Sequence, residues 1–329
     1  MSVGNNRKYT QGLCSVVCTT YNHANYSRAA IESIICQDFN PIEIIIIDDG
    51  SNDKNIDIIR AATKESGLNY KILTQKNTGN VAMNANRAIK EASGEYLILT
   101  SLDDILLPGC ISAKIKMMQC DPDLVIVGNS TYDEIDSIGN IIRIGCQNPI
   151  YGKENWSAAE LLEVEFSNIH SYFLQGTAIR TDFMSMIGGF EEGFFGDDLI
   201  LRTKIWKNLI VHPELRFLFL PHSGFAYRKH TESIHRRAFR QIRTVIDWSN
   251  HYFPGRPLPD LAQRWVRGYI NQCLDNSDDK ALDELISLDP KTKIIFESYS
   301  KTLKYRIRNI RRIIDRTLQK NSSTIRKIG

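Results

Sequence analysis

Residues 41–51 read Pro-Ile-Glu-Ile-Ile-Ile-Ile-Asp-Asp-Gly-Ser, an almost unbroken run of isoleucine that ends in two acids and a glycine. Such a run is typical of a strand that is buried on both faces, as in a parallel sheet. Gly50 and Ser51 favour a turn, which places Asp48 and Asp49 at the carboxyl end of the strand. The stretch therefore predicts a buried sheet with acidic side chains at one edge.

Short apolar runs alternate with helical patterns around this segment, and the alternation predicts an α/β fold with a mostly parallel, Rossmann-like sheet and helices on both faces. The expected strands are 13–18, 42–47, 70–73 and 96–100, and the expected helices are 25–36, 54–65 and 80–92. Right-handed crossovers bring the carboxyl ends of such strands to one edge, where open α/β sheets bind ligands.

Polar clusters follow three of these strands. They are Thr19-Thr20-Tyr21-Asn22, Asp48-Asp49-Gly50-Ser51 and Ser101-Leu102-Asp103-Asp104. Because all three should meet at the same edge, the sequence predicts an active site there. Asp103 suits a hard divalent cation that shares oxygen ligands with substrate phosphates. Asp103-Asp104 also suits the start of a helix, and these residues alone leave both interpretations open.

The later part of the chain changes character. A helix at 111–119, a strand at 124–127, a hairpin of 131–135 with 141–144 and a helix at 157–164 are expected, and beyond Arg228 the patterns are helical only. We expect a nucleotide-binding and catalytic domain in residues 1–230. A helical C-terminal region should follow in residues 231–329.

Charge is uneven along the chain. Residues 301–329 hold ten Lys or Arg and one acid, so they carry +9 and the remainder −6 of the net +3. An apolar stripe with helical spacing runs through this tail at Leu303, Ile307, Ile310, Ile314 and Leu318. Such a helix suits an anionic membrane surface. Packing against the acidic body is the alternative.

Several classes of protein are excluded or disfavoured. Seven cysteines without a CxxC pair predict neither a zinc cluster nor a disulfide framework. No secretion signal and no apolar run of roughly 20 residues is found, so a cytoplasmic protein, attached peripherally to the inner face of the plasma membrane, is expected. Neither GxxxxGK[ST] nor GxGxxG occurs, which disfavours kinases and dinucleotide-dependent oxidoreductases. No recognition motif supports a nucleic-acid partner.

Four segments in order resemble family 2 glycosyltransferases of the GT-A fold. They are SVVCTTYNHANY, IEIIIIDDGSNDKN, NTGNVAMNANRAIKEASGEYLILTSLDDILLP and YRKHTES, and the resemblance covers about residues 13–233. It implies a transfer that inverts the anomeric carbon, from a nucleotide sugar to a hydroxyl of a glycan or lipid-linked glycan in polysaccharide synthesis. A UDP-sugar is the first expectation and a dTDP-sugar the second.

The same resemblance implies roles for individual residues. Thr19, Tyr21 and Asn22 shape the base pocket, and Asp49 accepts a hydrogen bond from the base. The nucleotide is further expected to contact Asn77, Gly79, Asn84, Ser101 and Leu102. Asp103 matches the metal-binding Asp of the family's DxD element, so Mn²⁺ or Mg²⁺ is expected. His230 matches a position that contacts metal or diphosphate in some relatives, although a lone histidine is more often simply packed.

Asp197-Asp198 falls where relatives carry Glu-Asp, and this match implies Asp198 as the catalytic base. Acids also suit a helix start without any catalytic role. Relatives place an arginine six residues after the base, where this chain has Lys204. Matching Arg202 instead would put Gly196 at the base position, and we prefer Asp198 because a base needs a carboxylate.

Ser101 replaces an acid that is frequent in relatives, which weakens the expected metal site. A catalytically inactive scaffold in a glycan assembly complex is therefore one alternative function. A sugar nucleotidyltransferase is another, although the expected Gly-rich basic loop after the first strand is replaced by TTYNHANY. The sequence leaves the oligomeric state open.

Overall fold

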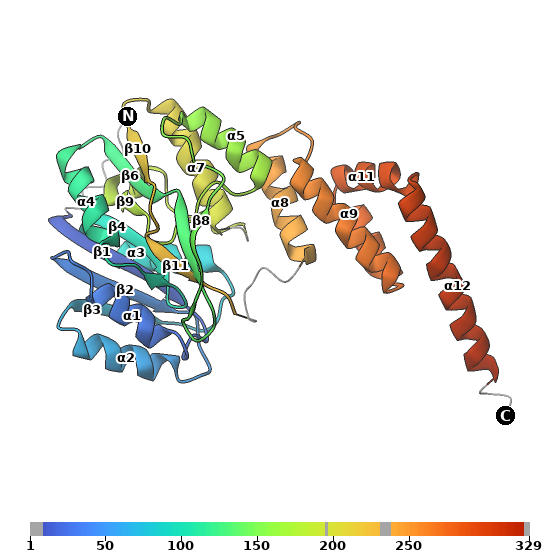
Figure 1. The fold of residues 1–329 in the computed structure, drawn as a ribbon, viewed down its shortest axis with the longest axis horizontal. Coiled ribbons are helices and arrows are strands. Elements are labelled where there is room, and N and C mark those ends of the chain that lie inside the picture. The colour runs from blue at the N-terminus through green and yellow to red at the C-terminus, as the bar shows by residue number, and fades with distance from the viewer. Residues whose placement is uncertain (1–8, 195–196, 231–237, 326–329) are drawn as a thin grey trace. The chain divides into compact units, whose positions relative to one another are not determined.

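The structure is a computed structural model that describes residues 9–194, 197–230 and 238–325, without the side chains of residues 197 and 315–325. The chain divides into two units, Met1–Ser233 and Ile234–Gly329. The first unit is built on a sheet of seven strands in the order β10-β6-β9-β4-β1-β2-β3 (Figure 1). These strands are β1 (Thr10–Thr20), β2 (Ile42–Asp48), β3 (Asn69–Thr74), β4 (Gly94–Ser101), β6 (Leu124–Asn129), β9 (Ala178–Arg180) and β10 (Arg216–Leu220).

The isoleucine run forms β2, and all seven of its residues are buried. β1 pairs in parallel with β2 and β4, and β2 pairs in parallel with β3. Glu43 is the one acid inside the run. Its carboxylate accepts hydrogen bonds from Ser15 Oγ at 2.5 Å and from the backbone and hydroxyl of Ser93 at 2.7 and 2.8 Å. These bonds offset the cost of burying a charge.

Helices cover both faces of the sheet, which confirms the predicted α/β class. On one face, α1 (Ser27–Ile35), α2 (Asn55–Glu65) and α4 (Cys110–Cys120) contribute to a core that includes Ile44 and Ile46. On the other, α3 (Val81–Glu91), α5 (Ala158–Asn168), α6 (Thr181–Met186) and α7 (Asp197–Val211) surround Ile45 and Ile47. The alternation of side chains along β2 thus supplies both cores.

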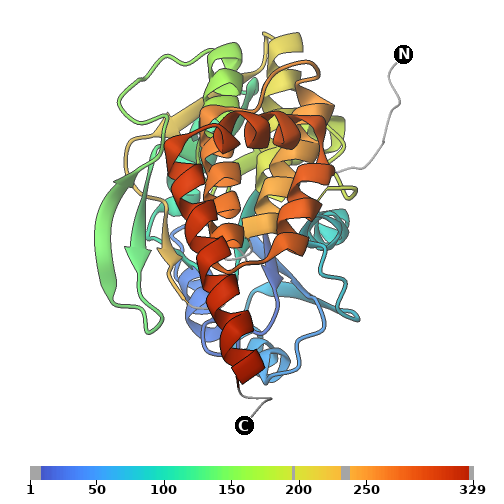
Figure 2. The same ribbon diagram turned by 90° about the vertical axis from the view of Figure 1, so that its right-hand side faces the viewer.

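A second, four-stranded sheet has the order β5-β11-β7-β8. Its strands are β5 (Ile105–Leu106), β11 (Phe225–Arg228), β7 (Thr131–Ile135) and β8 (Ile141–Gln147). β7 and β8 form the predicted hairpin, which lies at the margin of the first unit (green in Figure 2). β11 also pairs with β5, which directly follows the Asp103-Asp104 cluster. The pairing therefore places the C-terminal strand of the first unit beside these two acids.

Two strands of the large sheet were not predicted. β9 is only three residues long and runs antiparallel between β4 and β6. β10 pairs in parallel with β6 at the sheet margin, and its residues are only partly buried. β9 is too short to show a period, whereas β10 carries a run of four apolar residues, 217–220, before Pro221, which was an available signal of a strand.

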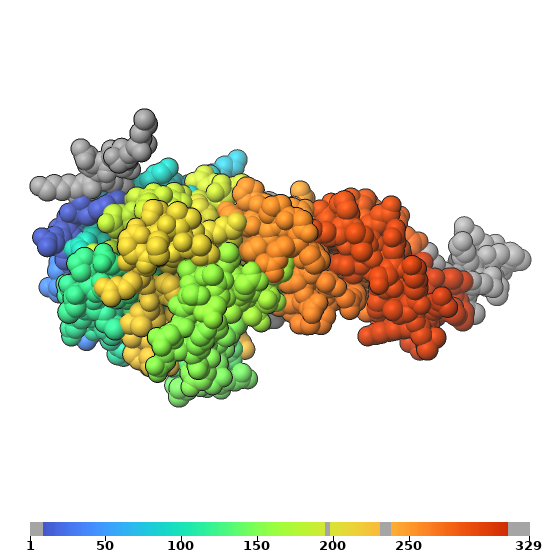
Figure 3. All heavy atoms as spheres, turned by 90° about the horizontal axis from the view of Figure 1, so that it is seen from above, coloured from blue at the N-terminus to red at the C-terminus, as the bar shows by residue number. Residues whose placement is uncertain are grey.

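The second unit is helical, as expected for the C-terminal region. It contains α8 (Ala238–Tyr252), α9 (Asp260–Asp275), α10 (Asp279–Leu288), α11 (Pro290–Ser300) and α12 (Leu303–Ile325). α9 contacts each of the other four helices, so the second unit is built around α9 (orange to red in Figure 3). Among the described residues, no helix is both long and apolar enough to cross a bilayer.

Candidate active site

Three strands of the large sheet end side by side. Thr20 of β1 lies opposite Asp48 of β2, and Thr19 lies opposite Ser101 of β4. This register places the three predicted polar clusters at one carboxyl edge. The two acidic pairs then differ in what surrounds each carboxylate.

Asp48 is held entirely by the turn that follows it. Its carboxylate accepts hydrogen bonds from the backbone and hydroxyl of Ser51 at 2.8 and 2.5 Å and from Asn55 Nδ2 at 3.0 Å. Asn55 also donates to Thr20 Oγ1 at 2.9 Å, which links β1 to the start of α2. Asp48 is 1% exposed, so its role is to fix this corner of the backbone.

Asp49 holds a different loop. Its Oδ1 accepts hydrogen bonds from Gln75 Nε2 at 2.8 Å and from the backbone and hydroxyl of Thr78 at 2.9 Å each, and its Oδ2 accepts one from Gly79 N at 3.0 Å. Burial alone would raise the pKa of Asp49, but the hydrogen bonds from Gln75 and Thr78 outweigh it and hold that pKa below its usual value. A carboxylate offers about four acceptor positions, so the protein itself fills those of Asp49.

The other residues expected at the nucleotide line this corner in different ways. Asn84 is 4% exposed, and its Oδ1 accepts hydrogen bonds from Thr78 Oγ1 and Gln75 Nε2. These bonds hold the loop between β3 and α3 against the first turn of α3. Asn77 is exposed, and Gly79 adopts φ +62° beside it. A Cβ at Gly50, which has φ +75°, would lie 2.6 Å from Asn77 N, so only glycine lets the two turns meet.

The loop after β1 is tied to the loop after β2. Asn22 has a positive φ of 55°, its N donates to Ser51 Oγ at 2.8 Å, and its Oδ1 accepts from Asn52 N at 2.9 Å. Tyr21 beside it is 42% exposed. Asn22 therefore shapes the loop, whereas Tyr21 is available for a ligand.

Asp103 differs from the β2 pair. Its Oδ2 lies 3.2 Å from His230 Nε2 and 3.8 Å from His23 Nε2, and its Oδ1 is buried without a hydrogen-bond partner among the described residues. Burial would raise the pKa of Asp103, but the hydrogen bond from His230 and the charge of His23 lower it to about 2. The group is thus an anion with one unused oxygen.

Neighbours of Asp103 fix its position. Asp104 is 3% exposed and accepts a hydrogen bond from Arg228 N at 2.9 Å, and burial beside the Asp103 charge raises the pKa of Asp104. The Arg228 side chain donates to Asp103 O at 2.7 Å and to Asp136 O at 3.0 Å in the β7–β8 turn. Leu102 is 0% exposed and packs in the core, so only its backbone is open to the expected nucleotide contact.

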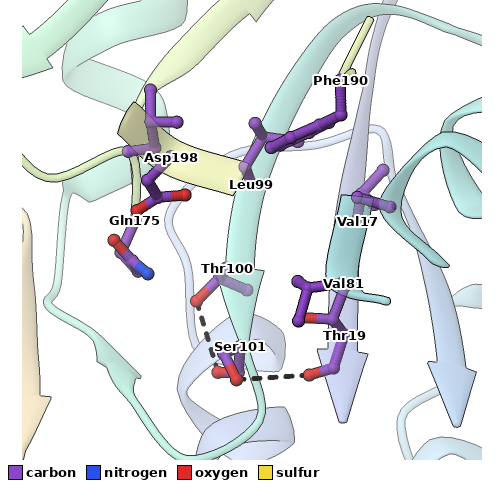
Figure 4. A pocket seen from close by; sticks show the side chains of 11 residues that line it. Val17, Thr19, Val81, Leu99, Thr100, Ser101, Gln175, Phe190 and Asp198 are labelled. Carbon is purple, nitrogen blue, oxygen red and sulfur yellow. Dashed lines mark hydrogen bonds between the residues drawn. The ribbon is translucent and has the colours of Figure 1, made fainter. Parts of the chain in front are cut away.

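A hollow lies beside the ends of β1 and β4, and we call it the central hollow (Figure 4). It is partly open to solvent. Its polar lining includes Thr19, Ser101, Gln175 and Asp198, and its apolar lining includes Phe190. Asp198, expected as the base, and Ser101, expected at the nucleotide, therefore face the same space. Asp197 begins α7, and its side chain lies outside the described residues.

Asp198 is connected to a buried ion pair. Arg202 Nη1 lies 3.8 Å from Asp198 Oδ2, and Arg202 Nε donates to both oxygens of Glu165 at 3.0 Å. The side chains of Arg202 and Glu165 are 3% and 0% exposed, whereas that of Asp198 is 32% exposed. Lys204 instead donates to Gly189 O at 2.6 Å. Arg202, one helical turn after Asp198, is thus the cation that faces it.

Sequence reasoning missed His23, Gln175 and Arg228. His23 lies inside the quoted segment after β1, so its place in a polar cluster was an available signal. Gln175 and Arg228 precede or end strands too short to show a pattern, and their neighbours at the site are far away in sequence. Arg228 does lie in the quoted segment YRKHTES, two residues before His230, which was an available signal, whereas the local sequence of Gln175 gives none.

The residues around Asp103 fit a divalent cation that shares ligands with a substrate. Asp103 Oδ1, which has no partner among the described residues, is a hard oxygen ligand, and His230 and His23 lie beside it and can bind a metal in their neutral forms. Among the described residues, no group of three or more His, Cys, Asp or Glu side chains is arranged to hold a metal by itself. Mg²⁺ commonly binds through one or two carboxylates plus substrate phosphates and water, which matches such an incomplete set.

Comparison with known proteins agrees with this architecture. The family model for glycosyl transferase family 2 matches residues 15–179, about half of the chain. The chain is 36% identical over 125 residues to the glycosyltransferase GlyG of Streptococcus pneumoniae, covering 38% of this chain and 41% of that protein. It is 30% identical over 150 residues to a chondroitin synthase of Escherichia coli, covering 45% of this chain and 21% of that protein. The matched segment thus spans less than half of these curated relatives.

Solved structures show a similar fold. S. aureus TarS 1-349 in complex with UDP-GlcNAc matches with a TM-score of 0.55 at 15% identity, covering 94% of this chain and 92% of that chain. The mannosyltransferase PcManGT from Pyrobaculum calidifontis, in complex with GDP-Man and Mn²⁺, matches with a TM-score of 0.52 at 14% identity, covering 91% and 84%. The chain belongs to glycosyl transferase family 2, and its first unit has the GT-A fold that the sequence predicted.

Proposed function

We propose that the chain is an inverting, metal-dependent glycosyltransferase that moves a sugar from a UDP-sugar, or alternatively a dTDP-sugar, to a hydroxyl of a glycan or lipid-linked glycan. The single observation that carries the proposal is the difference between its carboxylates. Asp103 has an oxygen at the sheet edge without a partner among the described residues, and Asp198 faces the central hollow beside Ser101, whereas Asp48 and Asp49 are filled by protein donors.

Nucleotide binding is assigned to the corner formed by the loops after β1, β2 and β3. The partly exposed ring of Tyr21 offers a stacking face for the base. Asp49 can accept from the base only if it exchanges one of its present donors, Gln75, Thr78 or Gly79. The further residues proposed to border the nucleotide are Thr19, Asn22, Asn77, Asn84, Ser101 and the backbone of Leu102.

Asp103 and His230 are the residues proposed to hold Mn²⁺ or Mg²⁺. When bound, such an ion acts as a Lewis acid that neutralises charge on the departing diphosphate. Arg228 keeps the Asp103 backbone in place through its hydrogen bond to Asp103 O. Asp104 is 3% exposed and accepts a hydrogen bond from Arg228 N, which ties it to β11.

Asp198 is proposed as the general base of a single displacement. It takes the proton of the acceptor hydroxyl while that oxygen bonds to the anomeric carbon, and the bond to the nucleoside diphosphate breaks on the opposite side. A positioned base typically contributes about 10²–10⁴-fold. Arg202, held by Glu165, lies 3.8 Å from the Asp198 carboxylate and orients it. Asp197, with Asp198, makes up the acidic pair at the start of α7.

For the acceptor we propose an anionic membrane surface as the place of encounter, reached through residues 301–329. Leu303, Ile307, Ile310, Ile313 and Ile314 of α12 are all more than half exposed. Arg308 and Arg312 form ion pairs with Asp275 of α9 and Asp279 of α10. Part of the basic charge of α12 is therefore paired within the second unit. Retention of the chain by vesicles with anionic lipid, but not by neutral ones, tests this contact.

The test of the enzymatic function is release of nucleoside diphosphate from a panel of nucleotide sugars, with Mn²⁺, with Mg²⁺ and with EDTA. We expect one donor to be hydrolysed slowly in a metal-dependent way, and Asp198→Asn to reduce glycosyl transfer by roughly 10²–10⁴-fold. Lys207→Gln, a helix α7 residue outside the proposed site, is the matched control and should retain activity.

A different result would point elsewhere. If no donor is turned over and calorimetry with metal shows no binding of any nucleoside diphosphate, the chain is not a glycosyltransferase. A catalytically inactive scaffold in glycan assembly is then the better interpretation. Release of pyrophosphate from a nucleoside triphosphate and a sugar phosphate would instead identify a nucleotidyltransferase.

A further inference from the structure

Among the residues that the structure describes, Gln175 in the lining of the central hollow has a polar atom without a partner. Gln175 lies between α5 and β9 and lines the hollow together with Asp198 (Figure 4). Its Oε1 is buried and accepts no hydrogen bond from any residue that the structure describes. Buried side-chain polar atoms in folded proteins mostly have a partner. Gln175 is therefore able to accept a hydrogen bond from a group that enters the hollow.

The backbone around Gln175 is fixed, so the side chain has a defined origin. Gly176 N donates to Leu99 O of β4 at 2.8 Å, and Thr177 N donates to Leu174 O at 2.9 Å. Gly176 has φ +70°, and a Cβ there would lie 3.2 Å from Cys110 Sγ. A tight turn anchored to β4 thus presents Gln175 to the hollow next to the strand that ends in Ser101.

The rest of the lining indicates what kind of group enters. Val17, Leu99, Leu174 and Phe190 provide apolar walls, and the polar atoms are few. Sites for small ligands typically combine such walls with a few polar groups that fix orientation. A pyranose ring fits this combination because its C–H faces are apolar and its hydroxyl groups lie around its edge.

We propose that Gln175 is a specificity-determining residue that accepts a hydrogen bond from a hydroxyl or acetamido N–H of the donor sugar. The inference rests on the proposed function, because it assumes that the nucleotide sugar lies at this edge. Asp49 and Tyr21 serve the nucleotide from the loops after β2 and β1, whereas Gln175 enters from the turn before β9. Its contribution is therefore confined to the sugar.

The experiment compares the protein with Gln175→Met, which keeps the side-chain length and removes the hydrogen-bond acceptor. Calorimetry in Mn²⁺ measures binding of UDP, UDP-glucose and UDP-N-acetylglucosamine. We expect Gln175→Met to weaken the better-bound UDP-sugar by roughly 2- to 10-fold, as for one lost hydrogen bond, and to leave UDP binding unchanged. Unchanged UDP binding also shows that the variant is folded. Gln147→Met, the same change on the exposed strand β8, should alter neither.

Two outcomes overturn the inference: equal weakening of UDP and UDP-sugar, or no weakening of either. In each of these cases the wild-type protein still binds nucleotide, so the proposed function survives. If the wild-type protein binds neither UDP nor a UDP-sugar, the assignment to a UDP-sugar transferase fails, and the role of Gln175 fails with it.

Discussion

The two acidic strand ends look alike in sequence and differ in structure. Asp48-Asp49 after β2 and Asp103-Asp104 after β4 are both pairs of aspartates at the carboxyl edge of the same sheet. At β2, protein donors occupy both carboxylates. At β4, Asp104 is bound to Arg228 N, but Asp103 keeps a buried oxygen without a partner among the described residues.

This difference separates acids that hold the protein together from acids that are available for a ligand. A carboxylate surrounded by N–H and O–H donors has little capacity left, since it has about four acceptor positions. One that keeps an open oxygen in a desolvated place is ready for a cation or a ligand donor. Removing the first kind should therefore reduce stability, and removing the second should reduce activity.

The largest expected effect is at Asp103. Asp103→Ala should lower kcat/KM by roughly 10³-fold, because several kcal/mol of charge stabilisation on the leaving group are lost. Its free energy of unfolding should fall by about 1–2 kcal/mol, because the lost contact with His230 is only partly offset by the relief of repulsion with the buried Asp104. Donor turnover in Mn²⁺ and urea unfolding measure the two quantities. A variant that is fully active, or one that is inactive only because it is unfolded, would contradict the claim that Asp103 mainly serves a ligand rather than the stability of the fold.

The next effect concerns the third acid of the site, Asp198, through its support. Arg202→Met should destabilise the protein by roughly 3–5 kcal/mol, because Glu165 is left buried without its cation. Arg202→Met with Glu165→Met removes both charges and should recover much of this loss, measured by urea unfolding. The double variant should nevertheless transfer sugar poorly, since Asp198 has lost the cation that faces it. Full recovery of activity would reduce Arg202 to a structural role.

A smaller effect is expected at Asp48, the structural counterpart of Asp103. Asp48→Ala removes the acceptor shared by the partly buried donors of Ser51 and the buried Asn55 amide and should cost about 2 kcal/mol of stability. The affinity for metal should remain that of the wild-type protein, which Mn²⁺ titration in the presence of UDP checks. A loss of metal affinity greater than that in Asp103→Ala would reverse the proposed assignment.

The smallest effect concerns pH. The pKa of Asp49 is lower in the folded protein than in the unfolded chain, so this residue stabilises the fold above its unfolded pKa of about 4. That contribution is lost as the pH falls through the folded pKa. Asp49→Asn should therefore be less stable than the wild-type protein by about 1 kcal/mol at pH 7, and the gap should close below about pH 4. Urea unfolding at pH 7, 5 and 3.5 measures it, and a constant gap would contradict the assignment.

Much of the fold was predictable because its signals are local. The strand at 42–47 and the helix at 54–65 agree with β2 and α2 to within one residue at either end. β9 was not predictable, because three residues carry no period and its pairing with β4 and β6 is decided by distant segments. Long buried elements can be predicted from their composition and period, whereas short inserted strands form only through tertiary contacts.

The site was predictable to a similar degree. The acidic pairs were visible because polar residues interrupt apolar strands at a turn. The state of each carboxylate was not visible, because the donors to Asp49 come from residues 75–79 and those near Asp103 from His23 and His230. Gln175 shows the same limit, since what defines it is an absent partner in a folded hollow.

Arg228 and His230 have a consequence for the order in which the protein is made. His230 lies 127 residues after Asp103, and Arg228, which fixes the Asp103 backbone, precedes it by two. On the ribosome, the Asp48 and Asp49 corner has all of its partners once residue 84 has emerged. The Asp103 corner must wait for the last strand of the first unit. A nascent chain can thus complete its nucleotide corner long before its proposed metal corner, and synthesis that stops before β11 yields a product without the latter.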